Sequence, residues 1–136
     1  MLQNSELDEL TAKIIGCAIA VHAALGPGLL ESIYCACLVI ELMEQGLTVE
    51  CERPIVVEYR GKRIAGNLKL DIIVEGCVVI EVKAVERLHP VHQAQLITYL
   101  KLSNLPAGLL MNFNDTTLKA GLRRVDHPNR YQATRT

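Results

Sequence analysis

The chain has 136 residues, 50% of them hydrophobic, and a formal net charge of −1. Apolar residues are spread along the whole chain, which argues against disorder and predicts one domain over residues 1–136. The balanced charge excludes a strongly basic, non-specific DNA-binding protein, although a local basic patch can coexist with an acidic metal site.

Nothing in the sequence is typical of a secreted or membrane protein. The polar start from Met1 to Glu6 lacks the basic region of a secretory signal, and no apolar run reaches the roughly 18 residues that span a bilayer. The chain has 5 cysteines, an odd number, mostly in apolar segments, which indicates free, mostly buried thiols. We therefore expect a protein of the reducing cytoplasm.

Two helices are predicted in the first third of the chain. Ser5, followed three residues later by Asp8, is typical of an N-terminal capping box. Apolar residues then recur at helical spacing, so the first helix is expected over residues 6–24. A glycine-proline-glycine break at 26–28 separates it from a second helix over residues 30–45.

The apolar period changes to two after the second helix. Alternating residues and turn signals predict three strands, over residues 49–59, 63–74 and 77–84, with turns at 60–62 and 75–76. The third strand is apolar except for Glu81 and Lys83, so we expect it at the centre of the sheet, covered on both faces.

The last third of the chain predicts a helix between strands. Pro90 suits the first turn of a helix over residues 91–102. A short apolar strand is expected over residues 107–112, and a more exposed strand over 117–125. The order ααβββαβ(β) predicts an α/β fold with a mixed sheet flanked by helices.

Three ionisable residues interrupt the most apolar strands. Glu81 and Lys83 point to one face of their strand, and Asp71 lies in the apolar segment before it. Buried charges are costly unless they are paired or bound to metal. A strand end in solvent, or a simple ion pair, would explain Glu81 and Lys83 alone. With Asp71 added, the set indicates metal-assisted phosphodiester hydrolysis: two carboxylate ligands for Mg²⁺ and a lysine that orients water or neutralises developing charge.

Further candidates lie on the predicted helices. Gln95 and Tyr99 are four residues apart and share a helix face with His92; amphipathic surface and core edge are the alternatives for the pair. Glu31, in the first turn of the second helix, either complements the helix dipole or serves as a further acidic ligand. Tyr34, three residues on, is expected to project beside it.

Four motifs follow one another along the chain. They are G-x-x-E-x-x-Y at 28–34, the aspartate Asp71, E-x-K at 81–83 and Q-x-x-x-Y at 95–99. In this order they resemble the small bacterial family known as GxxExxY proteins, and the resemblance covers about residues 10–125. It implies the PD-(D/E)XK nuclease superfamily and a restriction-endonuclease-like fold. The proline that usually precedes the aspartate is Leu70 here, a minor departure.

The residues and the resemblance together predict a Mg²⁺- or Mn²⁺-dependent nuclease acting on DNA or RNA. The expected site residues are the ligands Asp71, Glu81 and Glu31, the catalytic Lys83, and Gln95 and Tyr99 beside them. One alternative is a catalytically weak nuclease-fold module that binds nucleic acid or a protein partner, which the near-neutral charge favours. Another is a metal hydrolase with a different substrate. A homodimer would let two sites address two strands.

A shared metal site constrains the turn between its two strands. Residues directly opposite in an antiparallel pair share a face, and a two-residue turn would put Asp71 and Glu81 on opposite faces. We therefore predict an odd-length loop at 74–76, with Gly76 in the left-handed region and Asp71 diagonal to Glu81. If Glu31 is a ligand, its carboxylate should lie roughly 4–7 Å from one of the pair. A solvent-facing Glu31 far from both would leave only its effect on the helix dipole.

Overall fold

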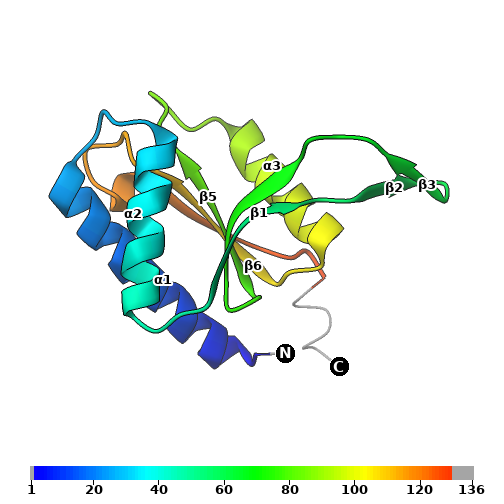
Figure 1. The fold of residues 1–136 in the computed structure, drawn as a ribbon, viewed down its shortest axis with the longest axis horizontal. Coiled ribbons are helices and arrows are strands. Elements are labelled where there is room, and N and C mark those ends of the chain that lie inside the picture. The colour runs from blue at the N-terminus through cyan, green and yellow to red at the C-terminus, as the bar shows by residue number, and fades with distance from the viewer. Residues whose placement is uncertain (1, 130–136) are drawn as a thin grey trace.

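Two helices come first, followed by five strands, a third helix and two final strands, within residues 2–129, the part of the chain that the computed structural model describes (Figure 1). The elements are α1 (Asn4–Leu25), α2 (Glu31–Glu44), β1 (Val49–Pro54), β2 (Val57–Tyr59), β3 (Lys62–Ile64), β4 (Lys69–Val74), β5 (Val78–Lys83), α3 (Pro90–Ser103), β6 (Ala107–Asn112), a short 3₁₀ helix η1 (Lys119–Gly121) and β7 (Leu122–Asp126).

Five of the strands form one mixed sheet in the order β1-β4-β5-β6-β7. Neighbouring strands are antiparallel except for β5 and β6, which are parallel and are connected through α3. The apolar strand predicted at the centre of the sheet is β5, so that prediction is confirmed. The α/β class with a mixed sheet flanked by helices is confirmed as well.

Each face of the sheet has its own apolar core. Side chains of α1 and α2 cluster with Ile80 and Val82 of β5, while side chains of α3 cluster with Val79. This separation follows from the two-residue period of a strand, which directs alternate side chains to opposite faces. Each fully buried aliphatic side chain of this size stabilises the fold by about 1.5–3 kcal/mol relative to exposure. The result is a three-layer arrangement with the sheet between helices (Figure 1).

A glycine sets the distance between α3 and the sheet. A Cβ added at Gly108 in β6 would lie 3.0 Å from side-chain atoms of Leu96, which is fully buried on α3. A larger residue there would push on the Leu96 side chain, so glycine favours this close packing of the helix. This close packing helps to fix α3, which carries the Q-x-x-x-Y residues, against the sheet.

The strands predicted over residues 49–59 and 63–74 are each divided in the structure. β1 ends at Pro54, which has no N–H for the ladder, and the backbone N–H of Ile55 donates to Leu68 O at 2.9 Å. Beyond this bond the chain leaves the main sheet, and β2 and β3 form a separate two-stranded sheet. The apolar alternation continues across the break, so the sequence pattern predicted single long strands. The hairpin turn predicted at 60–62 is present as a two-residue turn at 60–61, because Tyr59 pairs with Lys62, which already belongs to β3.

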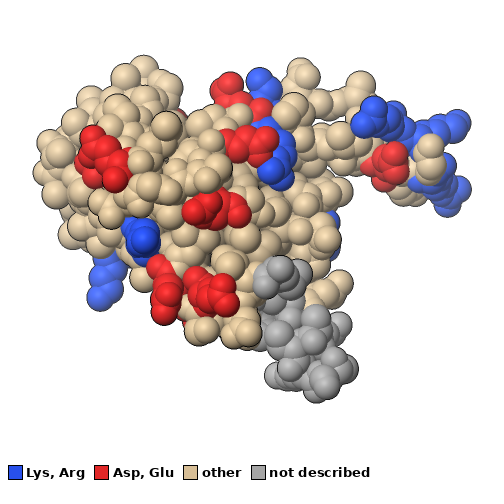
Figure 2. Space-filling model, turned by 60° about the horizontal axis from the view of Figure 1, so that its bottom comes forward, with Lys and Arg blue, Asp and Glu red and all other residues tan. Residues whose placement is uncertain are grey.

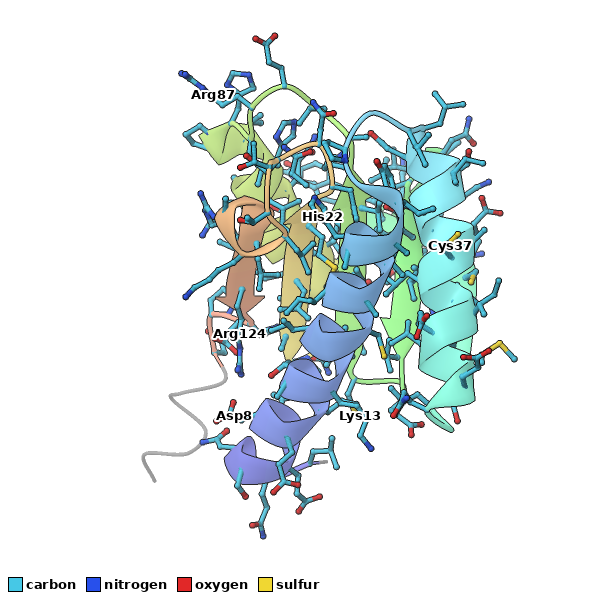
Figure 3. All side chains as sticks on the ribbon, turned by 90° about the vertical axis from the view of Figure 1, so that its left-hand side faces the viewer. Asp8, Lys13, His22, Cys37, Arg87 and Arg124 are labelled. Carbon is cyan, nitrogen blue, oxygen red and sulfur yellow. The ribbon has the colours of Figure 1, made fainter. Side chains whose placement is uncertain are left out.

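The predicted capping box at the start of α1 is wrong. The helix begins at Asn4, and its first turn has no side-chain cap. Asp8 instead accepts a hydrogen bond from Arg124 Nη1 of β7 at 2.8 Å, and Arg124 also donates to Thr11 Oγ1 at 3.3 Å. Figure 3 shows Arg124 directed toward Asp8 on α1. An ion pair to a distant strand therefore takes the carboxylate that the pattern assigned to the helix terminus.

Two smaller expectations are settled by the same structure. The strand predicted over residues 117–125 begins later, because η1 precedes β7. All five cysteines are free thiols, as the odd number indicated, but only Cys17 is buried, so the prediction of mostly buried thiols is wrong. No helix among residues 2–129 has the length and apolarity needed to cross a membrane.

Candidate active site

The loop between β4 and β5 brings the two site carboxylates opposite one another. Val74 pairs with Val78 and Ile72 with Ile80, so the loop is 75–77 and has odd length, as predicted. Continuing this register by one pair places Asp71 opposite Glu81, where the prediction had them diagonal. Gly76 is left-handed as expected, with φ 62°, and so is the residue before it. Because opposite residues share a face, Asp71 and Glu81 lie on the same face of the sheet, as a common site requires.

The carboxylates of Asp71 and Glu81 replace backbone acceptors where the β4–β5 ladder ends. The backbone N–H of Asp71 donates to Glu81 Oε1 at 3.2 Å, and the backbone N–H of Val82 donates to Asp71 Oδ2 at 3.1 Å. The backbone pairing of the two strands stops one residue earlier, at Ile72 and Ile80. Each side chain therefore satisfies an N–H of the opposite strand, which holds both carboxylates between the strands.

The backbone is irregular on the other side of Asp71 as well. Leu70 and Ile73 both pack in the α3-side core, although Ile72 packs against α1 and α2, so the alternation of β4 breaks at Asp71. On the neighbouring strand β1, Glu52 adopts a left-handed φ of 53°. Such local distortion is common beside functional sites, where it re-aims a side chain.

Burial raises the pKa of both carboxyl groups. Glu81 is only 7% exposed, and burial, with the charge of Asp71 added, raises its pKa from 4.5 to about 8. Burial also raises the pKa of Asp71, while the N–H of Val82 opposes that rise. The positive charge of Lys83 opposes both shifts. Without a cation, burial therefore favours a proton shared by the two carboxyl groups, and a cation would replace that proton.

Lys83 ends β5 at the same end of the sheet, and Asn112 fixes the chain that follows it. Lys83 pairs with Asn112 in the parallel β5–β6 ladder. The fully buried Asn112 accepts from Val85 N at 2.9 Å and donates to Val85 O at 2.9 Å. Sequence reasoning did not single out Asn112. The available signal was a polar residue closing an otherwise apolar strand.

Glu31 lies at this end of the sheet but outside the carboxylate pair. It is exposed, and its Oε2 lies 3.4 Å from the backbone N of Ala84, the residue after Lys83. Its negative charge contributes to the raised pKa of Asp71. Glu31 therefore faces neither the core nor remote solvent, and it lies at the mouth of the site.

The expectation that Tyr34 projects beside Glu31 is wrong. Its side chain is fully buried and stacks on Phe113, with ring centroids 4.6 Å apart. Its hydroxyl donates to Gly26 O at 2.6 Å and accepts from Leu29 N at 3.1 Å. Both bonds go to the glycine-rich turn before α2. Tyr34 thus fixes the turn that precedes Glu31. In the G-x-x-E-x-x-Y motif, the tyrosine therefore holds the backbone that positions the glutamate.

The α3 candidates line the other side. Tyr99 is half-buried, and burial together with the charges of Glu81 and Asp71 raises the pKa of its phenol. Gln95 is exposed, and no hydrogen bond joins it to either carboxylate among the described residues. A pocket of about 530 Å³, lined by Val85, Glu86, Arg87, His89 and His92, opens beside the end of β5. Burial and the charge of Lys83 lower the pKa of His92 there.

The carboxylate pair fits a hard divalent cation in charge and donor type. Mg²⁺ often binds through one or two carboxylates and keeps several waters. Within residues 2–129, however, no three His, Cys, Asp or Glu side chains converge as a preformed metal cluster. The predicted set of Asp71, Glu81 and Glu31 is therefore not assembled as three converging ligands, and only the first two face each other across the strands.

A mixed sheet between helices, with paired carboxylates at one end and a lysine two residues after the second, is the architecture of restriction-endonuclease-like nucleases. Comparison with protein families agrees: the model described as the PD-(D/E)XK nuclease superfamily matches residues 8–125. The chain belongs to this superfamily. No curated protein and no solved structure matches the chain significantly.

Proposed function

We propose that this chain is a Mg²⁺- or Mn²⁺-dependent nuclease, similar to GxxExxY proteins, that hydrolyses phosphodiester bonds in DNA or RNA. Superfamily membership supports nuclease chemistry in general. The observation that carries the metal dependence is the buried pair: Asp71 and Glu81 each hydrogen-bond a backbone N–H of the other's strand. Two carboxylates held this close cannot both ionise cheaply without a cation between them.

The roles of the pair and the lysine follow from their positions. Asp71 and Glu81 would hold the cation, which supplies positive charge for the attacking water and the phosphate. Lys83 lies near enough for its charge to oppose the rise in the pKa of both carboxyl groups that burial causes. Its ammonium would orient the water or meet the negative charge that develops on phosphate oxygens, while the pair remains the ligand set.

The remaining candidates would act around this centre. Tyr99, whose pKa is raised, keeps its proton and would donate a hydrogen bond to a phosphate oxygen. Glu31 would complete the acidic site through a bridging water, because it lies beside Ala84 rather than between the strands. Gln95, exposed on α3, would contact the substrate rather than the metal. We assign the whole of residues 1–136 to one nuclease-like domain acting in the cytoplasm.

A catalytically weak module that binds nucleic acid or a partner is the second candidate. Two observations favour it: the net charge of −1, and the lack of three converging ligands within residues 2–129. Such a module would keep the fold and the binding surface without efficient turnover.

The deciding experiment is cleavage of labelled single- and double-stranded DNA and RNA with Mg²⁺, with Mn²⁺ and with EDTA. The wild type should cleave at least one substrate only with metal. Lys83→Ala should lower turnover by about 10²–10³-fold, the usual loss for one preorganised electrostatic donor. Lys101→Ala, an exposed lysine on α3, is the matched control and should retain activity. Metal binding without cleavage of any substrate would establish the weak module instead.

A further inference from the structure

The β2–β3 ribbon projects from the body of the protein as an arm, defined here as residues 56–69. Figure 1 shows it extending away from both helical layers. Every arm residue is exposed except Val57, which is half-buried. A two-stranded ribbon of this kind is only marginally stable by itself in water, and here the exposed ribbon includes Tyr59 at 64% and Ile64 at 52% exposure. An exposed arm with large apolar side chains has the character of a contact surface.

The arm has a charge opposite to that of the rest of the chain. It contains four of the 14 Lys and Arg residues, namely Arg60, Lys62, Arg63 and Lys69, and one of the 15 Asp and Glu residues, Glu58. The arm therefore has a net charge of +3, and the other residues, with 10 basic and 14 acidic side chains, have a net charge of −4. Figure 2 shows the basic side chains gathered on the projecting arm.

The arm is attached to the strand that carries Asp71. Its last residue, Lys69, begins β4 and lies two residues before Asp71. Since β5 runs antiparallel to β4, Lys83 at the end of β5 lies at this same end of the sheet. Fully extended, the chain from Pro54 to Arg60 spans roughly 20 Å. A ligand held along the arm would therefore pass beside the carboxylate pair.

We propose that the arm is a double-stranded DNA-binding ribbon that holds the duplex against the active site. The inference rests on the proposed nuclease function, because it names the substrate that reaches the same site. The acidic carboxylate pair repels phosphates, and the remainder of the chain is acidic too. The arm's guanidinium and ammonium groups offset this repulsion and contact the phosphates, which supply most of the affinity in DNA binding.

The shape and composition of the arm favour a B-form duplex over other nucleic acids. The major groove of B-DNA admits a two-stranded ribbon, whereas the major groove of A-form RNA is too narrow for side chains to read. Proteins that bind single strands stack successive bases on several aromatic side chains, and the arm has one aromatic residue, Tyr59. The guanidinium carbon of Arg60 lies 5.6 Å from the centroid of that ring, so the tip pairs one aromatic surface with a positive charge.

The test is fluorescence anisotropy of the full chain with a labelled DNA duplex of about two helical turns, in EDTA and over a range of NaCl concentrations. The arm variant is Arg60→Ala/Lys62→Ala/Arg63→Ala. Its matched control, Lys13→Ala/Lys101→Ala/Lys119→Ala, removes the same charge from exposed positions on the body. Each lost phosphate contact lowers the log–log salt slope by about 0.9, so the arm variant should lose about 2–3 in slope and bind about 10–100-fold more weakly. The control should keep the wild-type slope.

Further measurements separate this inference from the nuclease proposal. With Mn²⁺, the arm variant should hydrolyse bis(p-nitrophenyl) phosphate at the wild-type rate while its kcat/KM on duplex DNA falls about 10–100-fold, because the salt-dependent contacts are lost. If the wild type binds duplex DNA through the arm but cleaves no substrate, the nuclease proposal is wrong and the DNA-binding role of the arm is supported. Tighter binding of single strands or duplex RNA, or equal losses in the arm variant and the control, would overturn the arm proposal. So would loss of a dimer, in sedimentation, from the arm variant alone.

Discussion

Glu81 should destabilise the metal-free protein at alkaline pH. Its folded-state pKa lies near 8, against an ordinary value of 4.5, chiefly because of burial. Between these values the unfolded chain loses the proton and the folded protein keeps it. The contribution of Glu81 to stability is therefore full below pH 4.5 and is lost as the pH rises through 8. At about 1.4 kcal/mol per pKa unit, the difference between the two pKa values corresponds to a loss of at most roughly 4–5 kcal/mol in the free energy of unfolding.

Glu81→Gln removes this ionisation while keeping the shape of the side chain. The amide oxygen can still accept from the backbone N–H of Asp71, as Oε1 does at 3.2 Å, and the amide N–H₂ can donate to the Asp71 carboxylate. We expect the variant to be about 2–4 kcal/mol more stable than wild type at pH 8, and to differ by less than about 1 kcal/mol at pH 5. The same change should weaken metal binding and turnover.

The assay is urea unfolding followed by circular dichroism, at pH 5 and pH 8, with EDTA and a thiol reductant. Glu44→Gln, at an exposed glutamate in the last turn of α2, is the control and should shift stability by no more than about 0.5 kcal/mol. A Glu81→Gln variant that is equally stable or less stable than wild type at pH 8, with no dependence of the difference on pH, would refute the account of this carboxylate.

Two further predictions concern residues that position the site. Tyr34→Phe removes the hydroxyl that bonds Gly26 O and Leu29 N. We expect thermal unfolding to show a loss of about 1–3 kcal/mol of stability, and we expect faster backbone hydrogen exchange in the turn at 26–30. An unchanged exchange rate there would contradict the anchoring role. Asn112→Ala leaves both backbone groups of Val85 without their partner. The variant should lose about 2–4 kcal/mol of stability in urea unfolding, and its turnover should fall more than its substrate binding. Full turnover in a folded variant would exclude Asn112 as a positioning residue.

The carboxylate pair was predictable because its signals are local. An ionisable residue in an apolar strand is costly wherever the strand lies, so Asp71 and Glu81 stand out before any tertiary contact is known. Parity then required an odd loop between them, which the structure has. The strand partner of Asp71 lies two residues further along β5 than predicted, because the sequence does not show that the loop takes up Cys77 rather than Val74.

Other features depended on tertiary contacts that no local pattern carries. Pro54 ends β1, but the apolar alternation continues on both sides of it, so the pattern predicted one strand where the structure has β1 and β2. Tyr34 was placed beside Glu31 by helical spacing, but the apolar ring of Phe113 and two backbone partners hold it in the core. Asp8 was assigned to a helix cap, and Arg124 from a distant strand binds it instead.

We propose that Asp71 and Glu81 bind the metal ion and that Lys83 acts in catalysis beside it. Calorimetric Mn²⁺ titration combined with cleavage kinetics tests this proposal most directly. Wild type should bind Mn²⁺ with release of protons and should cleave, since the proton held by the pair is displaced. Lys83→Ala should bind Mn²⁺ as tightly or more tightly and turn over about 10²–10³-fold more slowly, whereas Asp71→Asn should lose both binding and turnover. A well-folded wild type that binds no Mn²⁺ would contradict the account and make the three residues structural.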